Sequence, residues 1–166
     1  MVLGPLAQGA WAGDKTEKPK RPKTPWSTYS ASDGKYAWAE PSGWVLDEAH
    51  SVGGVSMMWN EPNNGGGTFR IAAYAKTGAS LVDLVKAASY GGKPRPSKAW
   101  MCAQGEHGDL KVAVAARVLD SGDYLLLVLS APPATFKWLG GLPGVRIAAN
   151  AVVGFKPTGG DWTPEQ

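Results

Sequence analysis

The sequence predicts an α+β domain in which one mid-chain helix and one C-terminal helix pack on a mainly antiparallel sheet. From residue 35 onward most of the chain alternates apolar with polar residues, and Gly-, Pro- and Asn-rich turns separate the alternating stretches. Only one segment, over 80–91, shows clear helical periodicity followed by stop signals. With 166 residues and 43% hydrophobic content, the chain is long enough for one layered domain and a tail.

The first strands are predicted over 36–40 and 44–46, with the turn Pro41-Ser42-Gly43 between them. In the next strand Val55, Met57 and Trp59 share one face, because side chains alternate along a strand. The segment 61–67 (EPNNGGG) is a turn that leads into a strand over 68–75, so this pair forms a hairpin.

The predicted helix begins after Ser80, whose hydroxyl can cap it, and Asp83 follows three residues later. Its apolar residues fall on one face at the spacing i, i+3, i+4 and i+7: Leu81, Leu84, Val85 and Ala88. Gly91-Gly92 and Pro94 end it.

Three strands are predicted next, over 99–104, 110–119 and 124–130, and the short turns between them make neighbours antiparallel. In the middle strand Lys111 and Arg117 indicate that one face is partly wet. The third strand is apolar throughout, which is typical of a central strand covered on both faces. Helical pieces are expected over 134–139 and 145–152, interrupted by Gly140-Gly141 and Pro143.

The net charge of +3 at pH 7 arises in one segment. Residues 14–25 hold five of the 17 basic residues and two of the 14 acidic ones, so the remainder carries 12 of each. The five bases are Lys15, Lys18, Lys20, Arg21 and Lys23. Because the segment also holds three prolines and lacks apolar residues for a core, it cannot fold alone. We interpret it as a docking arm that ends at Trp26.

The predicted organisation is an N-terminal tail over 1–34 that contains the arm at 14–26, a domain over 35–156 and a polar tail over 157–166. Residues 10–12 (AWA) have the form of a signal-peptidase site. Two interpretations stay open, a signal remnant over 1–12 or an ordinary tail. No run of eighteen apolar residues occurs, so we expect no membrane span.

Residue clusters that could carry chemistry are few. Acidic residues and a histidine occur together in the loop 47–50 and again in the turn 106–109, and both patterns favour solvated turns over a metal site, although the two could meet in space. The single cysteine, Cys102, has no neighbouring base and is expected to be an inert core thiol. No serine has the surroundings of a nucleophile, so we expect neither catalysis nor a cofactor.

Of the eight tryptophans, Trp11, Trp26 and Trp162 lie outside every predicted element. Exposed aromatic rings in polar tails are unfavourable in water, so we expect at least one of them to anchor to a partner.

The turn Pro41-Ser42-Gly43-Trp44 is followed by a hairpin, a helix, a Gly/Lys/Pro loop, long antiparallel strands and the closing segment 148–155 (AANAVVGF). This order resembles the PsbP family of extrinsic lumenal photosystem proteins over about residues 35–156. The resemblance implies the PsbP-like α-β-α sandwich.

It further implies a non-catalytic extrinsic subunit of a photosynthetic membrane complex, with photosystem II favoured over photosystem I. The location would be the chloroplast thylakoid lumen, peripheral to the membrane, and the partners would be membrane-intrinsic photosystem subunits reached by the arm. Lys93, Arg95 and Lys98, clustered in one loop, would form a second and smaller contact with an acidic surface. No metal or other cofactor is implied.

Two alternatives remain. The chain could be a secreted or periplasmic module of the same fold that binds a small ligand between sheet and helix, in an apolar pocket beside Trp100 or Trp138. Nucleic-acid binding through the arm is disfavoured, because the charge-balanced remainder offers no basic face to extend the phosphate contact.

Overall fold

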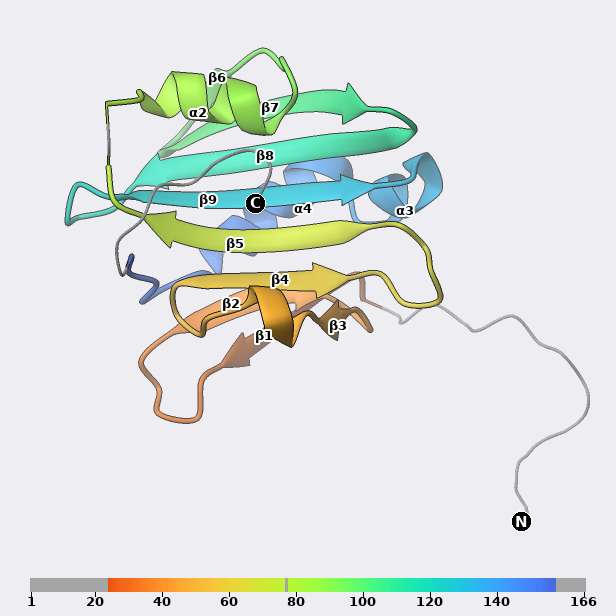
Figure 1. Ribbon diagram of the computed structural model, residues 1–166, viewed down its shortest axis with the longest axis horizontal. Coiled ribbons are helices and arrows are strands. Elements are labelled where there is room, and N and C mark those ends of the chain that lie inside the picture. The colour runs from red at the N-terminus through yellow and green to blue at the C-terminus, as the bar shows by residue number, and fades with distance from the viewer. Residues whose placement is uncertain (1–23, 77, 158–166) are drawn as a thin grey trace, which may run out of the picture.

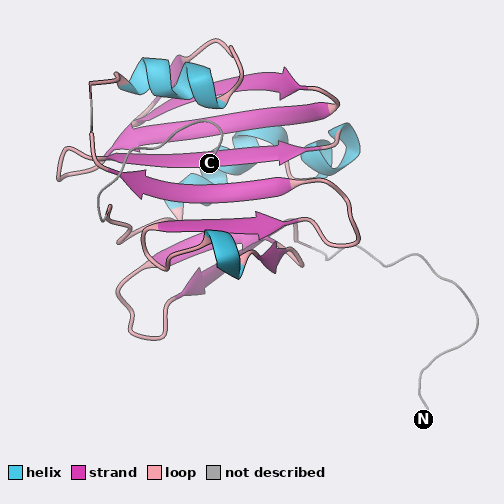
Figure 2. Ribbon diagram, viewed as in Figure 1, coloured by secondary structure: helices cyan, strands magenta, loops and turns pink. Residues whose placement is uncertain are grey.

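The computed structural model describes residues 24–76 and 78–157, which form a seven-stranded sheet with helices on both faces and a separate two-stranded hairpin (Figure 1; Figure 2). Every strand pair is antiparallel. The sheet contains, in spatial order, β3 (Val45–Leu46), β4 (Ser56–Asn60), β5 (Thr68–Tyr74), β9 (Tyr124–Ala131), β8 (Leu110–Val118), β7 (Trp100–His107) and β6 (Arg95–Ser97). The predicted α+β class is confirmed.

Strand β9 lies at the centre of the sheet, as its unbroken apolar sequence predicts. It joins the β4–β5 hairpin to the β7–β8 hairpin, which are far apart in sequence. The sheet therefore has two distinct halves that meet at β9.

One face, here called the inner face, is closed by α3 (Pro133–Trp138), α4 (Gly141–Asn150) and the hairpin of β1 (Trp26–Ser30) and β2 (Ala37–Pro41). Trp59, Phe69 and Leu127 are almost completely buried there. The β8 face that Lys111 and Arg117 indicated as wet is also part of this core, because Ala113 and Ala115 between them are fully buried. That prediction was wrong: the two charged residues lie at the strand ends, and the small side chains between them let α4 approach closely.

On the opposite face, here called the outer face, the described residues supply only α2 (Leu81–Ala88), with the short helix η1 (Glu48–His50) beside β4. Figure 1 shows α2 lying over β7 and β8. Its predicted N-cap is confirmed, since the Ser80 Oγ accepts a hydrogen bond from the Asp83 N–H at 3.1 Å. Leu84, Val85 and Ala88 are the buried residues of the helix, as the spacing predicts.

Three boundaries differ from the sequence prediction. Strand β1 lies inside the tail expected over 1–34, because Trp26 is apolar enough to join the core and Tyr29 pairs with Trp38. Strand β6 lies in the expected basic loop. Helix α4 begins at Gly141, and Pro143 sits in its first turn, where the missing N–H costs nothing; the break before it is at Gly140, at a φ of 88°.

Candidate functional site

The predicted docking arm cannot be placed, because Lys15, Lys18, Lys20, Arg21 and Lys23 lie outside the described residues. Where the described part begins, the chain already turns toward the core. Ser42 N–H donates a hydrogen bond to the Pro25 carbonyl at 2.9 Å.

Trp26, predicted to anchor a partner, is instead held by its own domain. Its Nε1–H donates to the Leu139 carbonyl oxygen at 2.8 Å, and its ring meets Phe69 edge-on with centroids 5.0 Å apart. The indole thus fixes β1 to the turn before α4. This partner-binding assignment is corrected to a packing role, because an amphipathic ring with a buried acceptor nearby gains more from the core than from water.

The three loop cations all lie at the edge of the sheet and are exposed to solvent. Arg95 begins β6, Lys93 precedes it, and Lys98 occupies the turn to β7 at a φ of 56°. Pro96, in the middle of β6, has no N–H to offer at this edge. Addition of another strand is therefore disfavoured, and recognition here would fall to side chains.

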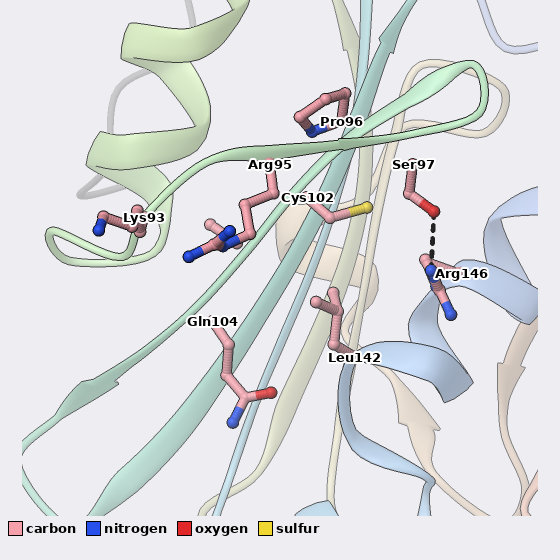
Figure 3. Close-up of a pocket in the computed structure, with 9 residues that line it drawn as sticks. Lys93, Arg95, Pro96, Ser97, Cys102, Gln104, Leu142 and Arg146 are labelled. Carbon is pink, nitrogen blue, oxygen red and sulfur yellow. Dashed lines mark hydrogen bonds between the residues drawn. The ribbon is translucent and has the colours of Figure 1, made fainter.

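A groove of about 460 Å³ lies between this edge and α4, on the inner side of the sheet. Figure 3 shows Arg95 and Gln104 on the strand side and Leu142 and Arg146 on the helix side. The full lining is Lys93, Arg95, Pro96, Ser97, Cys102, Ala103, Gln104, Leu142 and Arg146. We call this the basic groove, since its described lining residues include three cations and no carboxylate.

Arg146 is the one cation of the groove that sequence reasoning missed. It comes from α4, and the Ser97 Oγ accepts a hydrogen bond from its Nη1 at 2.7 Å, which ties the helix to β6 (Figure 3). The available signal was helical spacing: Leu142 and Arg146 are four residues apart and share a face that the buried Val145 and Ala149 do not occupy. What the sequence could not give is that this face meets the β6 edge.

The floor of the groove includes Cys102, which is 3% exposed. Burial raises the pKa of the Cys102 thiol, and the positive charge of Arg146 offsets only part of that rise. The sequence around Cys102 gave no sign of Arg146, which comes from α4, but the thiol is buried as expected and remains protonated at neutral pH. The floor of the groove therefore supplies no negative charge that could neutralise Lys93, Arg95 and Arg146.

The two clusters suspected of chemistry lie on opposite sides of the sheet. Asp47, beside β3, accepts hydrogen bonds from His50 Nδ1 at 2.9 Å and from Asn60 Nδ2 at 3.2 Å. Both bonds lower the pKa of Asp47, and the bond from Asn60 has the larger effect. At the β7–β8 turn, Glu106 pairs with Lys111 at 2.5 Å. At least three strands, β4, β5 and β9, separate the clusters, so they form no composite site.

Within residues 24–76 and 78–157, no three metal-ligating side chains of the His, Cys, Asp or Glu type gather closely enough to hold an ion. In the same part of the chain, none of the helices has the length and apolar character needed to cross a bilayer.

The sequence predicted an apolar pocket beside Trp100 or Trp138, but the two cavities described here lie elsewhere. Trp100 is packed tightly, with its Nε1–H donating to Asn150 Oδ1 at 3.2 Å and the Arg117 guanidinium 5.2 Å from its ring centroid. Neither the basic groove nor the hollow beside the β8–β9 turn is lined by Trp100 or Trp138.

Comparison with solved structures supports the fold. The yeast (Saccharomyces cerevisiae) Ran-binding protein Mog1p superposes with a TM-score of 0.51 at 8% identity, covering 81% of this chain and 97% of Mog1p. The cyanobacterial PsbP (CyanoP) of Synechocystis sp. PCC 6803 gives 0.47 at 13% identity, covering 83% and 97%. A Bacteroides thetaiotaomicron protein gives 0.43 at 14% identity, covering 81% and 50%.

No protein-family model matches the chain, and no curated protein matches its sequence. The likeness to Mog1p, at its low identity, shows a shared fold and nothing of function.

Proposed function

We propose that this protein is a non-catalytic accessory subunit that docks on an acidic protein surface of a larger assembly through the basic groove. The observation that carries the proposal is the convergence of Lys93, Arg95 and Arg146, from segments about fifty residues apart, on one groove whose lining has no carboxylate. Unneutralised cations held close together repel one another, and an acidic partner relieves that repulsion.

The geometry of the groove supports a protein segment as the occupant. Arg146 is pre-oriented by Ser97, so binding a carboxylate there requires little further ordering of this side chain. Pro96 and Leu142 add apolar surface between the charges, which suits an extended acidic segment with an occasional apolar residue. Lys98, exposed in the turn that follows β6, would add long-range attraction without a fixed contact.

The identity of the assembly rests on the sequence resemblance to PsbP over residues 35–156. On that basis we propose that the protein is an extrinsic subunit of a photosystem on the lumenal side of the chloroplast thylakoid membrane, with photosystem II favoured. The arm, with Lys15, Lys18, Lys20, Arg21 and Lys23, would supply a second contact to the same intrinsic subunits.

Rebinding to salt-washed photosynthetic membranes tests this function. A variant with Lys93→Gln, Arg95→Gln and Arg146→Gln should lose most of its binding, and its affinity should depend less on salt. The matched control replaces three exposed lysines elsewhere, Lys76, Lys86 and Lys137, by Gln, which removes the same net charge. Equal retention of both variants would refute docking through the groove.

A second candidate, a binding module for a small anionic ligand, is favoured by one observation. The volume of about 460 Å³ falls within the range of small-molecule sites. Calorimetry with citrate separates the two: micromolar binding that Arg146→Gln abolishes would support the small-ligand function, whereas docking on a protein surface predicts only weak, salt-sensitive binding of free citrate.

A further inference from the structure

The described residues cover only half of the outer face of the sheet. One row of cross-strand partners runs through Met58, Arg70, Val128, Val114 and Ala103, all on this face. Val114 and Ala103, beneath α2, are 0% and 2% exposed, whereas Met58, Arg70 and Val128 are partly exposed. Coverage by α2 therefore ends between β8 and β9, and the surface of β4, β5 and β9 beyond it is here called the open face.

Arg70 lies in the middle of the open face without a carboxylate partner among the described residues. Its Nη2 reaches only the Met58 sulfur, at 3.8 Å, which is a weak acceptor. Burial lowers the pKa of Arg70, so its guanidinium has lost part of its hydration without a compensating negative charge. An anionic group would be stabilised here more than at a fully exposed cation.

The flanking side chains of the open face are apolar or neutral. Met58 and Val128 stand on either side of Arg70, with Thr68 and Ser130 in the next row. A matching occupant therefore needs an apolar or aromatic group and a carboxylate close together. A second copy of this face does not fit, because two Arg70 side chains would then face each other.

The chain itself contains such a segment. Residues 158–166 (TGGDWTPEQ) lie outside the described part; they hold Trp162, Asp161 and Glu165 and no basic residue. Lys156, shortly before them, is tied to the loop that leads into β4, because its N–H donates to the Gly54 carbonyl at 2.9 Å.

Chain length permits the contact. From Gly54 to the row of Met58 is four residues, about 13 Å along an extended strand, and Arg70 is one strand further, about 5 Å. Asp161 and Trp162 are five and six residues beyond Lys156, which gives a reach of about 17 to 20 Å. Glu165 reaches farther still.

We propose that residues 158–166 cover the open face, with the Trp162 ring against Met58 and Val128 and a carboxylate of Asp161 or Glu165 on the Arg70 guanidinium. Trp162 is then an internal anchor, and the segment closes the outer face where α2 stops. This inference is independent of the basic groove.

The Met58 methyl group provides the test, by NMR of the full chain with ¹³C-labelled methionine methyls. The expected result is an upfield ring-current shift of the Met58 methyl and a cross-peak to an indole, both lost in Trp162→Leu. Met57, whose side chain points to the inner face, is the internal control and should not move. A Met58 resonance unchanged in Trp162→Leu would overturn the proposal.

Two further measurements test which molecule covers the open face and whether a carboxylate contacts Arg70. In a mixture of labelled and unlabelled chains, a cross-peak between different molecules would assign the face to a second copy and overturn the proposal. Arg70→Gln, or Asp161→Asn with Glu165→Gln, should move the Met58 methyl toward its position in Trp162→Leu. A shift that stays at the wild-type value in both charge variants would show that Arg70 does not hold the segment, and would overturn the proposed charge contact.

Discussion

The two faces of the seven-stranded sheet are built differently. The inner face is closed by two helices, a hairpin and Trp26, so that Trp59, Phe69 and Leu127 are each at most 1% exposed. The outer face has a single eight-residue helix over β7 and β8, and beyond it Arg70 remains partly exposed. Stability thus concentrates on the inner face, and capacity for interaction lies where coverage stops.

The same contrast explains the position of the basic groove. It lies at the β6 edge, where the inner layer ends and α4 no longer covers the strands completely. Cations at this edge do not destabilise the core, because they stay in contact with water. The fold therefore separates its packing residues from its charged contacts, and the two can be altered independently.

The largest expected effect comes from breaking the inner face. Phe69→Ala removes a fully buried ring that stacks on Trp59 with centroids 5.7 Å apart and touches Trp26, so we expect a loss of about 3–5 kcal/mol in the free energy of unfolding. Val128→Ala, on the open face of the same sheet, should cost about 1 kcal/mol. Urea denaturation measures both. Similar losses for the two would contradict the contrast between faces.

A smaller loss of stability is expected when the packing of α2 on the outer face is disturbed. A Cβ at Gly105 would overlap the carbonyl oxygen of Ser89, the C-cap residue of α2. Gly105→Ala should lift the helix end and cost about 1–3 kcal/mol, while Gly78→Ala, with open space around it, is the control. Hydrogen exchange should show faster opening of α2 with β4 and β5 unchanged. Uniform acceleration throughout the sheet would show that the two halves are not separable.

The smallest effect concerns pH and the hairpin that closes the inner face. Burial raises the pKa of Glu40 above 4.5, and the Trp38 and Trp59 hydrogen bonds offset only part of this rise. The folded state therefore binds the proton more tightly than the unfolded state, and this stabilisation is present at acid pH and lost as pH rises above 4.5.

Glu40→Gln keeps an acceptor for the Trp38 Nε1–H, 2.8 Å away in the wild type, and removes the titration. We expect the urea midpoint of the variant to gain relative to wild type as pH rises from about 4 to about 7. Glu48→Gln, at an exposed carboxylate, is the control. A difference between Glu40→Gln and wild type that is the same at every pH would exclude the proposed proton linkage.

Much of the fold could be predicted because its signals are local. Alternation predicted β4 and β8, the turn over 61–67 predicted β5, and the unbroken apolar run predicted β9, while the spacing of Leu84, Val85 and Ala88 predicted α2. Strands β1 and β6 were missed because their pairing partners, not their own sequences, make them strands. The composition of both segments, with Pro96 in one and polar residues after Trp26 in the other, is typical of a loop. They become strands because β7 and β2 pair with them.

The site was predictable only in part. Lys93, Arg95 and Lys98 stand close in sequence, so their cluster was visible, whereas Arg146 enters from α4 through a tertiary contact with Ser97. Trp26 was misassigned because its acceptor, the Leu139 carbonyl, is 113 residues away. Long-range contacts of this kind leave no trace in a single sequence.

A photo-crosslink from inside the basic groove tests whether an acidic partner docks there. A photoreactive side chain at Gln104, which lines the groove, should capture a segment rich in Asp and Glu from an intrinsic subunit in native photosynthetic membranes, and the yield should fall when Arg95→Gln and Arg146→Gln are added. The same group at Lys86, on α2, should capture little. Equal yields from both positions, or yields from Gln104 that ignore the two arginines, would contradict docking through the groove.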